Sequence, residues 1–350
     1  MRIAYMIDTM NTFGGAQRVI AVLCNQSIND NQQTHLILTG NVYDSVYPLS
    51  NGLKVFCCTE SSSRISKLLR IRKYIKENHI DYVVSFMDLV NIYAILSLLG
   101  SKIPVIISER IDPDRNTRLI QLLDRLFYNL SATAVVQTTE IADKFRKFYK
   151  KNIYVIPNPI NDQVVCKGDY SITNKAIAVG RLTPQKNYKL MIDAFCMFRK
   201  NYPDYVLEIY GRGYEKDSLT EYIIKNGCDE FIFLKGNAPD IIQFEHLADF
   251  YIMTSDYEGM PNALAEAMAA GLPCISTNCD GGGAASLITN DYNGILVNKG
   301  DKNGLVDAMI KITKDRVFAY TIGQAAHDIK NKLSSENIYN MWKNVLLSLK

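Results

Sequence analysis

Two glutamates lie eight positions apart in the segment "SDYEGMPNALAEAMAAGLPCIS". Glu258 stands among glycine, proline and asparagine, whereas Glu266 stands in an alanine-rich stretch. Pro261 suits the first turn of a helix and Gly271 suits the position just after one, so we predict a helix over about 261–270. Glu258 would then precede the helix and Glu266 would lie a little over one turn inside it. Carboxylates in these places can accept hydrogen bonds from sugar and ribose hydroxyls.

The start of the predicted helix is a candidate anion site. The amides of Asn262 and Ala263 would have no partner within the helix, and the positive end of a helix favours negative charge. Gly259 and Met260, in the loop before it, belong to the same predicted site. The alternative to a ligand site is a helix with an exposed glutamate beside an acidic loop. For either glutamate alone that alternative would be preferred.

Two cations in "AVGRLTPQKNYKL" change this balance. Arg181 ends a predicted strand and Lys186 follows five residues later, before a helix. An arginine can bridge two oxygens while a lysine supplies a point charge, so the pair suits a diphosphate. Gly211 and Gly213 in "IYGRGYEKDSL" form another strand–glycine–helix junction that would permit close approach of a ligand, a weak signal by itself.

A double glycine follows the first predicted strand, in "IDTMNTFGGAQRVI". Gly14 and Gly15 allow a tight turn, and the helix that begins after them offers free amides to an anion. The pattern is not G-x-G-x-x-G, and no acidic residue follows where a ribose would need one, so a dinucleotide site is poorly supported. A plain glycine turn into a helix remains the alternative.

The elements that must position these residues alternate along the whole chain. Thirteen short runs rich in β-branched residues are separated mostly by helical patterns, which indicates parallel sheets covered by helices. Thirteen strands are too many for one compact sheet. We therefore predict two doubly wound α/β domains that face each other across a cleft, with a helical tail from about 301. The expected boundaries are an acceptor-side domain over 1–165 and a nucleotide-sugar domain over 166–334, joined by a polar linker at 158–175. A helix over 335–350 is expected to pack back on the first domain.

Composition is that of a water-soluble globular protein, with 47% hydrophobic and 21% charged residues among 350. No run of about 18 uncharged apolar residues appears, and the first ten residues do not form a signal peptide, so a cytoplasmic protein is expected. The eight cysteines form no C-x-x-C, and the four histidines are far apart. Buried, reduced thiols are therefore favoured over zinc ligands or disulfides.

In order and spacing, these motifs resemble glycosyltransferase family 4, whose members are retaining and have the GT-B fold. The resemblance rests on "GGAQRV", "VGRLTPQKN", "YGRGYEKDSL", "EGMPNALAEAMAAGLPCIS" and "NDYNGILV" and covers nearly the whole chain. Glu258 and Glu266 match the family's E-x7-E. The stretch "SFMDLVNIYAIL" followed by "PVIISER" is similar to a subgroup that builds bacterial surface polysaccharides and other lipid-linked glycans.

The resemblance implies a role for each matched residue. Arg181 and Lys186 would bind the donor diphosphate, Glu266 the ribose and Glu258 the donor sugar. Further substrate contacts are implied for residues along both halves of the chain: Gly14, Gly15, Glu109, Arg110, Gly211, Gly213, Lys235, Gly259, Met260, Asn262 and Ala263. Glu109 and Arg110 stand where the family places polar acceptor or sugar contacts, often a histidine. Gln17 and Ser286 depart from the family pattern, which usually has glutamate at both places.

The implied reaction is retaining transfer of a hexose or N-acetylhexosamine from a UDP-linked donor, with GDP left open, to a hydroxyl of a glycan acceptor, lipid-linked in this subgroup. No cofactor or metal is expected, because the family needs none. Asp112 and Asp114 form a D-x-D that we interpret as a turn. Nucleotide-sugar epimerases and phosphorylases share this architecture. A nucleotide-sugar-binding subunit without activity is the alternative from another class.

Residues 1–165 carry 19 Lys/Arg against 14 Asp/Glu, so the first half is basic. In segment 64–76, Leu68, Ile71 and Ile75 form one apolar stripe with cations on another side, and in segment 144–151 five cations are interleaved with Phe145, Phe148 and Tyr149. This pattern suits an anionic membrane surface. We therefore expect peripheral contact with the inner face of the cell membrane. The alternative is that the apolar stripes pack on the sheet and the cations are only solvated. No nucleic-acid partner is expected.

Overall fold

The computed structural model describes residues 1–12, 14–40, 44–58, 63–110, 112–115, 117–166, 171–236 and 248–349. The chain divides into two compact units. Unit 1 consists of Met1–Pro159 together with Leu333–Lys350, and unit 2 consists of Ile160–Lys332. The expected linker at 158–175 includes four residues, 167–170, that lie outside the described part of the chain.

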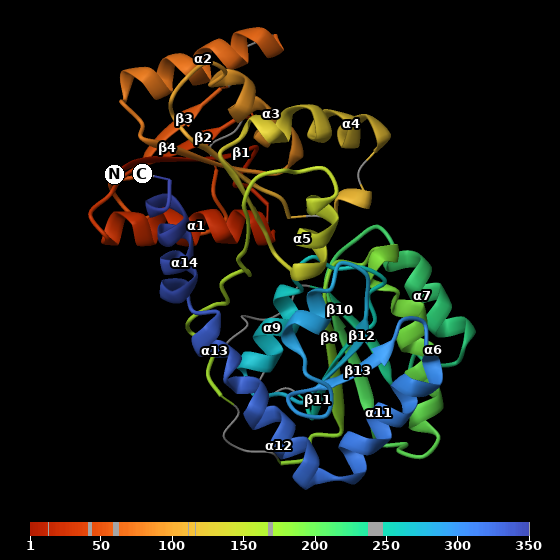
Figure 1. The fold of residues 1–350 in the computed structure, drawn as a ribbon. Coiled ribbons are helices and arrows are strands. Elements are labelled where there is room, and N and C mark those ends of the chain that lie inside the picture. Colours follow the sequence, from red (N-terminus) through yellow and green to blue (C-terminus); the bar gives the residue numbers. More distant parts are fainter. Residues whose placement is uncertain are drawn as a thin grey trace. The chain divides into compact units, whose positions relative to one another are not determined.

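Unit 1 is built on a seven-stranded, all-parallel sheet with the order β3-β2-β1-β4-β5-β6-β7 (Figure 1). Its central strands are buried, as expected of a parallel sheet that helices cover on both faces. The strands are β1 (Arg2–Ile7), β2 (Gln33–Leu38), β3 (Lys54–Cys57), β4 (Tyr82–Phe86), β5 (Val105–Ser108), β6 (Thr133–Val136) and β7 (Ile153–Val155).

The helices of unit 1 lie on the two faces of this sheet. Side chains from α2, α3 and α5 share one core cluster with the sheet, whereas α1 and α14 pack against each other. The helices are α1 (Gly15–Asn29), α2 (Arg64–Glu77), α3 (Asp88–Ser97), α4 (Arg118–Phe127), α5 (Thr139–Arg146) and α14 (Ser335–Leu347), with short 3-10 turns η1 (Pro113–Arg115) and η2 (Tyr128–Leu130).

The C-terminal helix α14 belongs to unit 1 although it follows unit 2 in sequence. Tyr339 donates a hydrogen bond to Asp30 at 2.9 Å, and Lys343 forms an ion pair with the same carboxylate at 2.8 Å. Trp342 is 1% exposed and packs on Phe86, with 5.5 Å between ring centroids. These contacts fix α14 beside α1 and the carboxyl end of β4.

Unit 2 repeats the plan with a six-stranded parallel sheet of order β10-β9-β8-β11-β12-β13. The strands are β8 (Lys175–Val179), β9 (Val206–Tyr210), β10 (Ile232–Gly236), β11 (Phe250–Met253), β12 (Cys274–Asn278) and β13 (Ile295–Asn298). In this order β8 and β11 are neighbours and their outgoing loops diverge, which is the position where doubly wound sheets bind ligands.

The helices of unit 2 include the one predicted from the two glutamates. It is α9 (Asn262–Ala269), with Pro261 at its N-cap, and it ends before Gly271 at a φ of 79°. The amide of Leu272 closes the end by donating to Ala267 at 3.0 Å. The remaining elements are η3 (Pro184–Lys186), α6 (Tyr188–Arg199), α7 (Lys216–Lys225), α10 (Gly283–Leu287), α11 (Lys302–Lys314), α12 (Arg316–His327) and α13 (Ile329–Lys332).

The predicted fold class is confirmed: each unit is a Rossmann-like parallel sheet flanked by helices, and all thirteen predicted strands are present. The cysteine prediction is wrong for one pair, because Cys196 and Cys228 of unit 2 form a disulfide. The other six cysteines are free thiols, as expected. In the described parts of the chain, no helix is long and apolar enough to cross a bilayer.

Candidate active site

The centre of the site in unit 2 is an ion pair between two loops. Lys186 Nζ lies 2.5 Å from Glu258 Oε1, and the two side chains are only 15% and 10% exposed. Ser255 donates to the same carboxylate oxygen at 2.9 Å. Lys186 comes from the loop after β8 and Glu258 from the loop after β11, so a cation and a carboxylate meet at the carboxyl edge of adjacent strands.

Backbone and amide hydrogen bonds join these two loops on either side of the ion pair. The Asp256 amide donates to the Gln185 carbonyl, and the Gln185 side chain donates to the Tyr257 carbonyl, both at 2.8 Å. Asn187, which holds a left-handed φ of 47°, donates to the Asp256 carboxylate at 3.0 Å. Because the loops are held together independently of the ion pair, the lysine and the glutamate are positioned before any ligand arrives.

Two glycines let neighbouring loops approach this pair. A Cβ on Gly211 would lie 1.8 Å from the carbonyl oxygen of Gly180, and a Cβ on Gly281 would lie 2.4 Å from that of Glu258. Both have positive φ, 155° and 88°, which other residues rarely adopt. The loop after β12 is also joined to Glu258, because the Glu258 amide donates a hydrogen bond to the Asp280 carbonyl at 2.9 Å. Contacts between backbones therefore require these glycines, whichever ligand binds.

Three other predicted residues of unit 2 take distinct positions. Arg181 is exposed just beyond β8. Glu266 is 2% exposed on α9, and the first residues of that helix, Asn262 and Ala263, are half-buried. Lys235, on β10, lies 3.6 Å from the carboxylate of Glu208. Asn237, the last residue of the "LKGN" stretch, lies outside the described residues.

The predicted residues of unit 1 lie at the carboxyl ends of its strands. Gly14 caps α1 and Gly15 is its first residue, after β1. The Gly14 carbonyl accepts a hydrogen bond from Tyr47 at 3.2 Å. Glu109 and Arg110 directly follow β5, and both are buried, 1% and 8% exposed.

Glu109 is enclosed in a polar network. Its carboxyl group accepts from the Arg110 amide at 2.9 Å and from the Tyr128 hydroxyl at 3.0 Å. Burial, followed by the neighbouring Asp88 carboxylate, raises the pKa of Glu109 well above its usual range. The protonated form of Glu109 is therefore favoured more than that of an exposed glutamate, and its proton can bridge to Asp88.

Arg110 is held between rings. Its guanidinium lies 4.8 Å from the ring centroid of Phe86 and 5.6 Å from that of Trp342, and Nη1 donates to Asn158 at 2.8 Å. Burial lowers its pKa to about 9. Nε and Nη2 have no hydrogen-bond partner among the described residues. Through Trp342, α14 thus contacts one of the predicted site residues.

Two sequence profiles match consecutive parts of the chain. The profile described as Glycosyltransferase Family 4 matches residues 13–164, and the one described as Glycosyl transferases group 1 matches residues 168–332. The chain belongs to glycosyltransferase family 4. It is a glycosyltransferase, and its two Rossmann-like units are those of the GT-B fold.

Individual relatives agree with this assignment. The chain is 25% identical, over its full length and 99% of the relative, to the GalNAc-α-(1→4)-GalNAc-α-(1→3)-diNAcBac-PP-undecaprenol α-1,4-N-acetyl-D-galactosaminyltransferase of Campylobacter jejuni. Sucrose-phosphate synthase of Thermosynechococcus elongatus has a similar structure, with a TM-score of 0.87 at 14% identity, covering 99% of this chain and 98% of that one. The structure of Anabaena Alr3699/HepE, solved with UDP and glucose, is also similar. Its TM-score is 0.82 at 16% sequence identity, and the match covers 99% of this chain and 100% of that one. At these identities the two structures show the fold alone.

The geometry brings together some of the residues that the sequence singled out in this glycosyltransferase. Lys186 and Glu258 are in contact, whereas Arg181 lies just beyond β8 and Glu266 lies on α9 of the same unit. Sequence reasoning gave no role to Gly281 or to Asp256, which hold the Glu258 loop. The triple glycine in "DGGGAAS" was the available signal for the first; nothing in the sequence pointed to the second.

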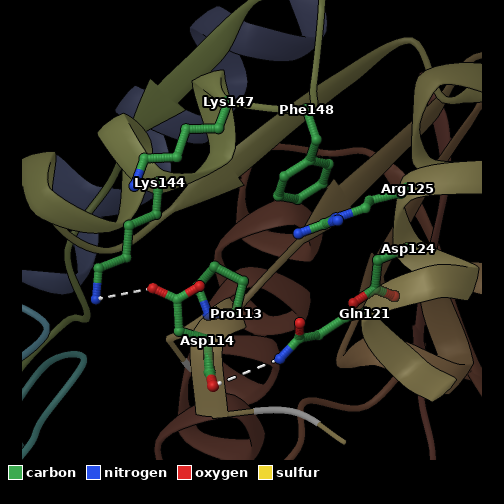
Figure 2. Close-up of a pocket in the computed structure, with 8 residues that line it drawn as sticks. All are labelled: Pro113, Asp114, Gln121, Asp124, Arg125, Lys144, Lys147 and Phe148. Carbon is green, nitrogen blue, oxygen red and sulfur yellow. Dashed lines mark hydrogen bonds and ion pairs between the residues drawn. The ribbon is translucent and has the colours of Figure 1, made fainter. Parts of the chain in front are cut away.

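The D-x-D forms a turn, as interpreted. The Asp114 amide donates to the Asp112 carboxylate at 3.1 Å, and Lys144 pairs with both carboxylates, at 3.7 Å for Asp114 (Figure 2). Among the described residues, no group of three or more potential metal ligands comes together. A lysine thus already supplies the positive charge at this pair of aspartates.

Glu109 gives a prediction about pH. Its folded-state pKa exceeds the unfolded value of about 4.3, so the folded state binds one more proton between the two and stability falls as pH rises through that interval. Glu109→Gln keeps the shape and a donor toward Asp88 but cannot titrate. We expect its unfolding temperature to rise relative to the wild type as pH increases from about 5 to about 8.

Glu221, which is exposed, provides the matched control. The difference in unfolding temperature between Glu221→Gln and the wild type should stay constant across the same pH series. A constant difference for Glu109→Gln as well, measured by thermal denaturation, would show that Glu109 is ionised in the folded protein.

Proposed function

We propose that this glycosyltransferase moves a hexose or N-acetylhexosamine from a UDP-linked donor to a hydroxyl of a lipid-linked glycan, with retention of configuration. The observation that carries the proposal is the charge arrangement beside β8 and β11, where Lys186 is paired with Glu258. Arg181 stands five residues before this lysine in the chain, and α9 begins four residues after this glutamate. Cations and carboxylates at one strand edge suit a ligand that has both a diphosphate and hydroxyls.

The proposed donor lies with its diphosphate against Arg181, Lys186 and the amides of Asn262 and Ala263. Glu266 accepts hydrogen bonds from the ribose, and Glu258 accepts from the sugar. When the bond between the anomeric carbon and the phosphate oxygen breaks, negative charge grows on the departing diphosphate. Fixed cations and helix amides stabilise that charge without having to reorganise, which lowers the barrier.

Retention follows if the acceptor oxygen attacks on the face from which the diphosphate leaves. The acceptor oxygen then bonds to the anomeric carbon while its proton passes to the departing phosphate oxygen. No covalent intermediate with the protein is needed. This assignment is the expectation for family 4, and it leaves Glu258 to orient the sugar and balance the Lys186 charge.

Two findings support the choice of substrates. The Campylobacter jejuni relative, which matches the whole chain, is named for an undecaprenol-diphosphate-linked acceptor. The Anabaena structure was solved with UDP and glucose. We propose that the enzyme uses a lipid-linked acceptor in the cytoplasm at the inner face of the cell membrane, in the assembly of a bacterial surface polysaccharide or related glycan.

The test of this function is release of UDP from a panel of UDP-sugars, with and without a polyprenyl-diphosphate glycan. Transfer requires both substrates, whereas an epimerase turns over the donor alone and a binding subunit releases nothing. Arg181→Ala should lower turnover by about 10²–10³, as when one preorganised donor is lost. Lys302→Ala, an exposed cation on α11 in the same unit, is the control and should not change turnover. A folded Arg181→Ala protein with normal turnover would remove the arginine from the mechanism.

A second prediction concerns divalent metal ions. Fixed cations and helix amides can neutralise the leaving diphosphate by themselves, so transfer should continue in excess EDTA. The assay compares initial rates with EDTA alone and with added Mg²⁺ or Mn²⁺. Abolition by EDTA with recovery on adding metal would contradict the proposal and return attention to Asp112 and Asp114.

A further inference from the structure

The exposed apolar side chains of unit 1 are concentrated in one part of it. Nine large hydrophobic residues are exposed among the described residues of this unit, and eight of them fall between Ile65 and Leu130. Single exposed leucines are ordinary, but a contiguous group indicates an interaction surface. The group runs from α2 past α3 to α4, helices that are neighbours in the fold (Figure 1).

The densest part of this group is a stripe along α4 and η2. Leu119, Leu122, Leu126 and Leu130, here called the leucine stripe, are 66%, 55%, 59% and 54% exposed. Their spacing of three, four and four residues puts them on one side of the helix. A stripe with this spacing normally faces the core, yet here it faces solvent.

Other residues attach α4 to its unit. Leu123 and Phe127 pack on the core cluster of unit 1. The most buried residue of the helix is Asp124, at 2% exposure. The leucine stripe is therefore not needed to hold the helix in place, and it can contact a partner without unfolding anything.

Cations border the stripe on one side. Arg118 and Arg125 are both exposed and lie seven positions apart, which places them on the same flank of α4. Next to that flank is a pocket of about 370 Å³, where Arg125 and Lys147 extend from α4 and the end of α5 (Figure 2). Lys144, also in the pocket, already pairs with acidic side chains. Arg125 and Lys147 take part in no ion pair between described residues.

We propose that the leucine stripe, with Arg118, Arg125 and Lys147 beside it, docks on an anionic phospholipid bilayer. The leucines enter the boundary between headgroups and acyl chains, and the cations meet lipid phosphates at the mouth of the pocket. This combination of an apolar stripe and a basic flank is the one that binds membrane interfaces. A second copy of the chain fits less well, because a two-fold contact with the two α4 helices antiparallel would bring the arginines of both copies together.

This surface differs from the one expected from sequence, with which it shares Lys147 of segment 144–151. The surface expected in segments 64–76 and 144–151 included Ile71, Ile75, Phe145 and Tyr149. All four are buried in the core of unit 1, so for them the alternative of packing on the sheet is the correct one. Docking through α4 rests on the proposed function only for its purpose, which is to keep the enzyme beside a lipid-linked acceptor. The surface itself is inferred from exposure and charge.

The experiment is co-sedimentation of the full-length protein with phosphatidylcholine vesicles, with and without phosphatidylglycerol. We expect binding only when phosphatidylglycerol is present. The triple variant Leu119→Ser, Leu122→Ser, Leu126→Ser should bind at least about tenfold more weakly, because the apolar contribution is lost. The matched control changes three exposed apolar residues of unit 2, Ile224→Ser, Val317→Ser and Tyr320→Ser, and should bind like the wild type.

Insertion is tested separately with Leu122→Trp. The chain's single tryptophan, Trp342, is buried, so a blue shift of emission on adding anionic vesicles would come from position 122. The charge part is tested with Arg118→Glu and Arg125→Glu, which should abolish binding at low salt. Equal binding by the stripe triple and the control triple, or no blue shift, would overturn the proposal.

Light scattering tests the alternative that a second copy of the chain binds the leucine stripe. A wild-type dimer that the stripe triple converts to monomer, with vesicle binding unchanged, would assign the stripe to self-association and overturn membrane docking. UDP release with a water-soluble acceptor is measured on the same proteins. A wild-type protein that does not bind anionic vesicles but releases UDP normally overturns docking alone, whereas a wild-type protein that binds vesicles but releases no UDP overturns the proposed function alone.

Discussion

The contact between Lys186 and Glu258 is the constraint around which the site in unit 2 is arranged. A mostly buried ion pair is costly unless its remaining groups are satisfied and its geometry is fixed. Ser255 satisfies the carboxylate, and hydrogen bonds between the loops after β8 and β11 fix the geometry. Glycines at 211 and 281 follow from the same constraint, because the neighbouring loops must approach closely to hold that arrangement.

The two units use buried polarity differently. In unit 2, opposite charges are brought together at a strand edge where a diphosphate would compete for the cation. In unit 1, the corresponding edge holds Glu109, whose pKa is raised by burial, and Arg110 between two rings, one of them supplied by α14. Unit 1 also carries the outward leucine stripe. We infer that unit 2 supplies the electrostatics of transfer, whereas unit 1 presents acceptor contacts and a surface for the membrane that holds the acceptor.

The sequence was sufficient for the fold, because buried parallel strands and helix ends leave strong local patterns; all thirteen strands and the helix ending before Gly271 were predicted. Contacts between distant segments leave no such pattern, which is why the Cys196–Cys228 disulfide was missed. Helical periodicity also cannot tell which side of a helix faces the core. It selected Ile71 and Phe145, which are buried, and gave no reason to single out Leu122, which is exposed. The roles of Arg181, Lys186, Glu258 and Glu266 remain predictions from the family.

The central claim is that the two glutamates act on different parts of one donor, and calorimetric titration with UDP tests it most directly. Glu266→Gln should weaken UDP about tenfold or more, since hydrogen bonds to a charged group contribute about 1.5–3 kcal/mol and 1.4 kcal/mol is tenfold. Glu258→Gln should bind UDP at least as tightly as the wild type, because UDP lacks the sugar and Lys186 loses its competing carboxylate. Equal losses in both variants, or a loss in Glu258→Gln alone, would contradict the account.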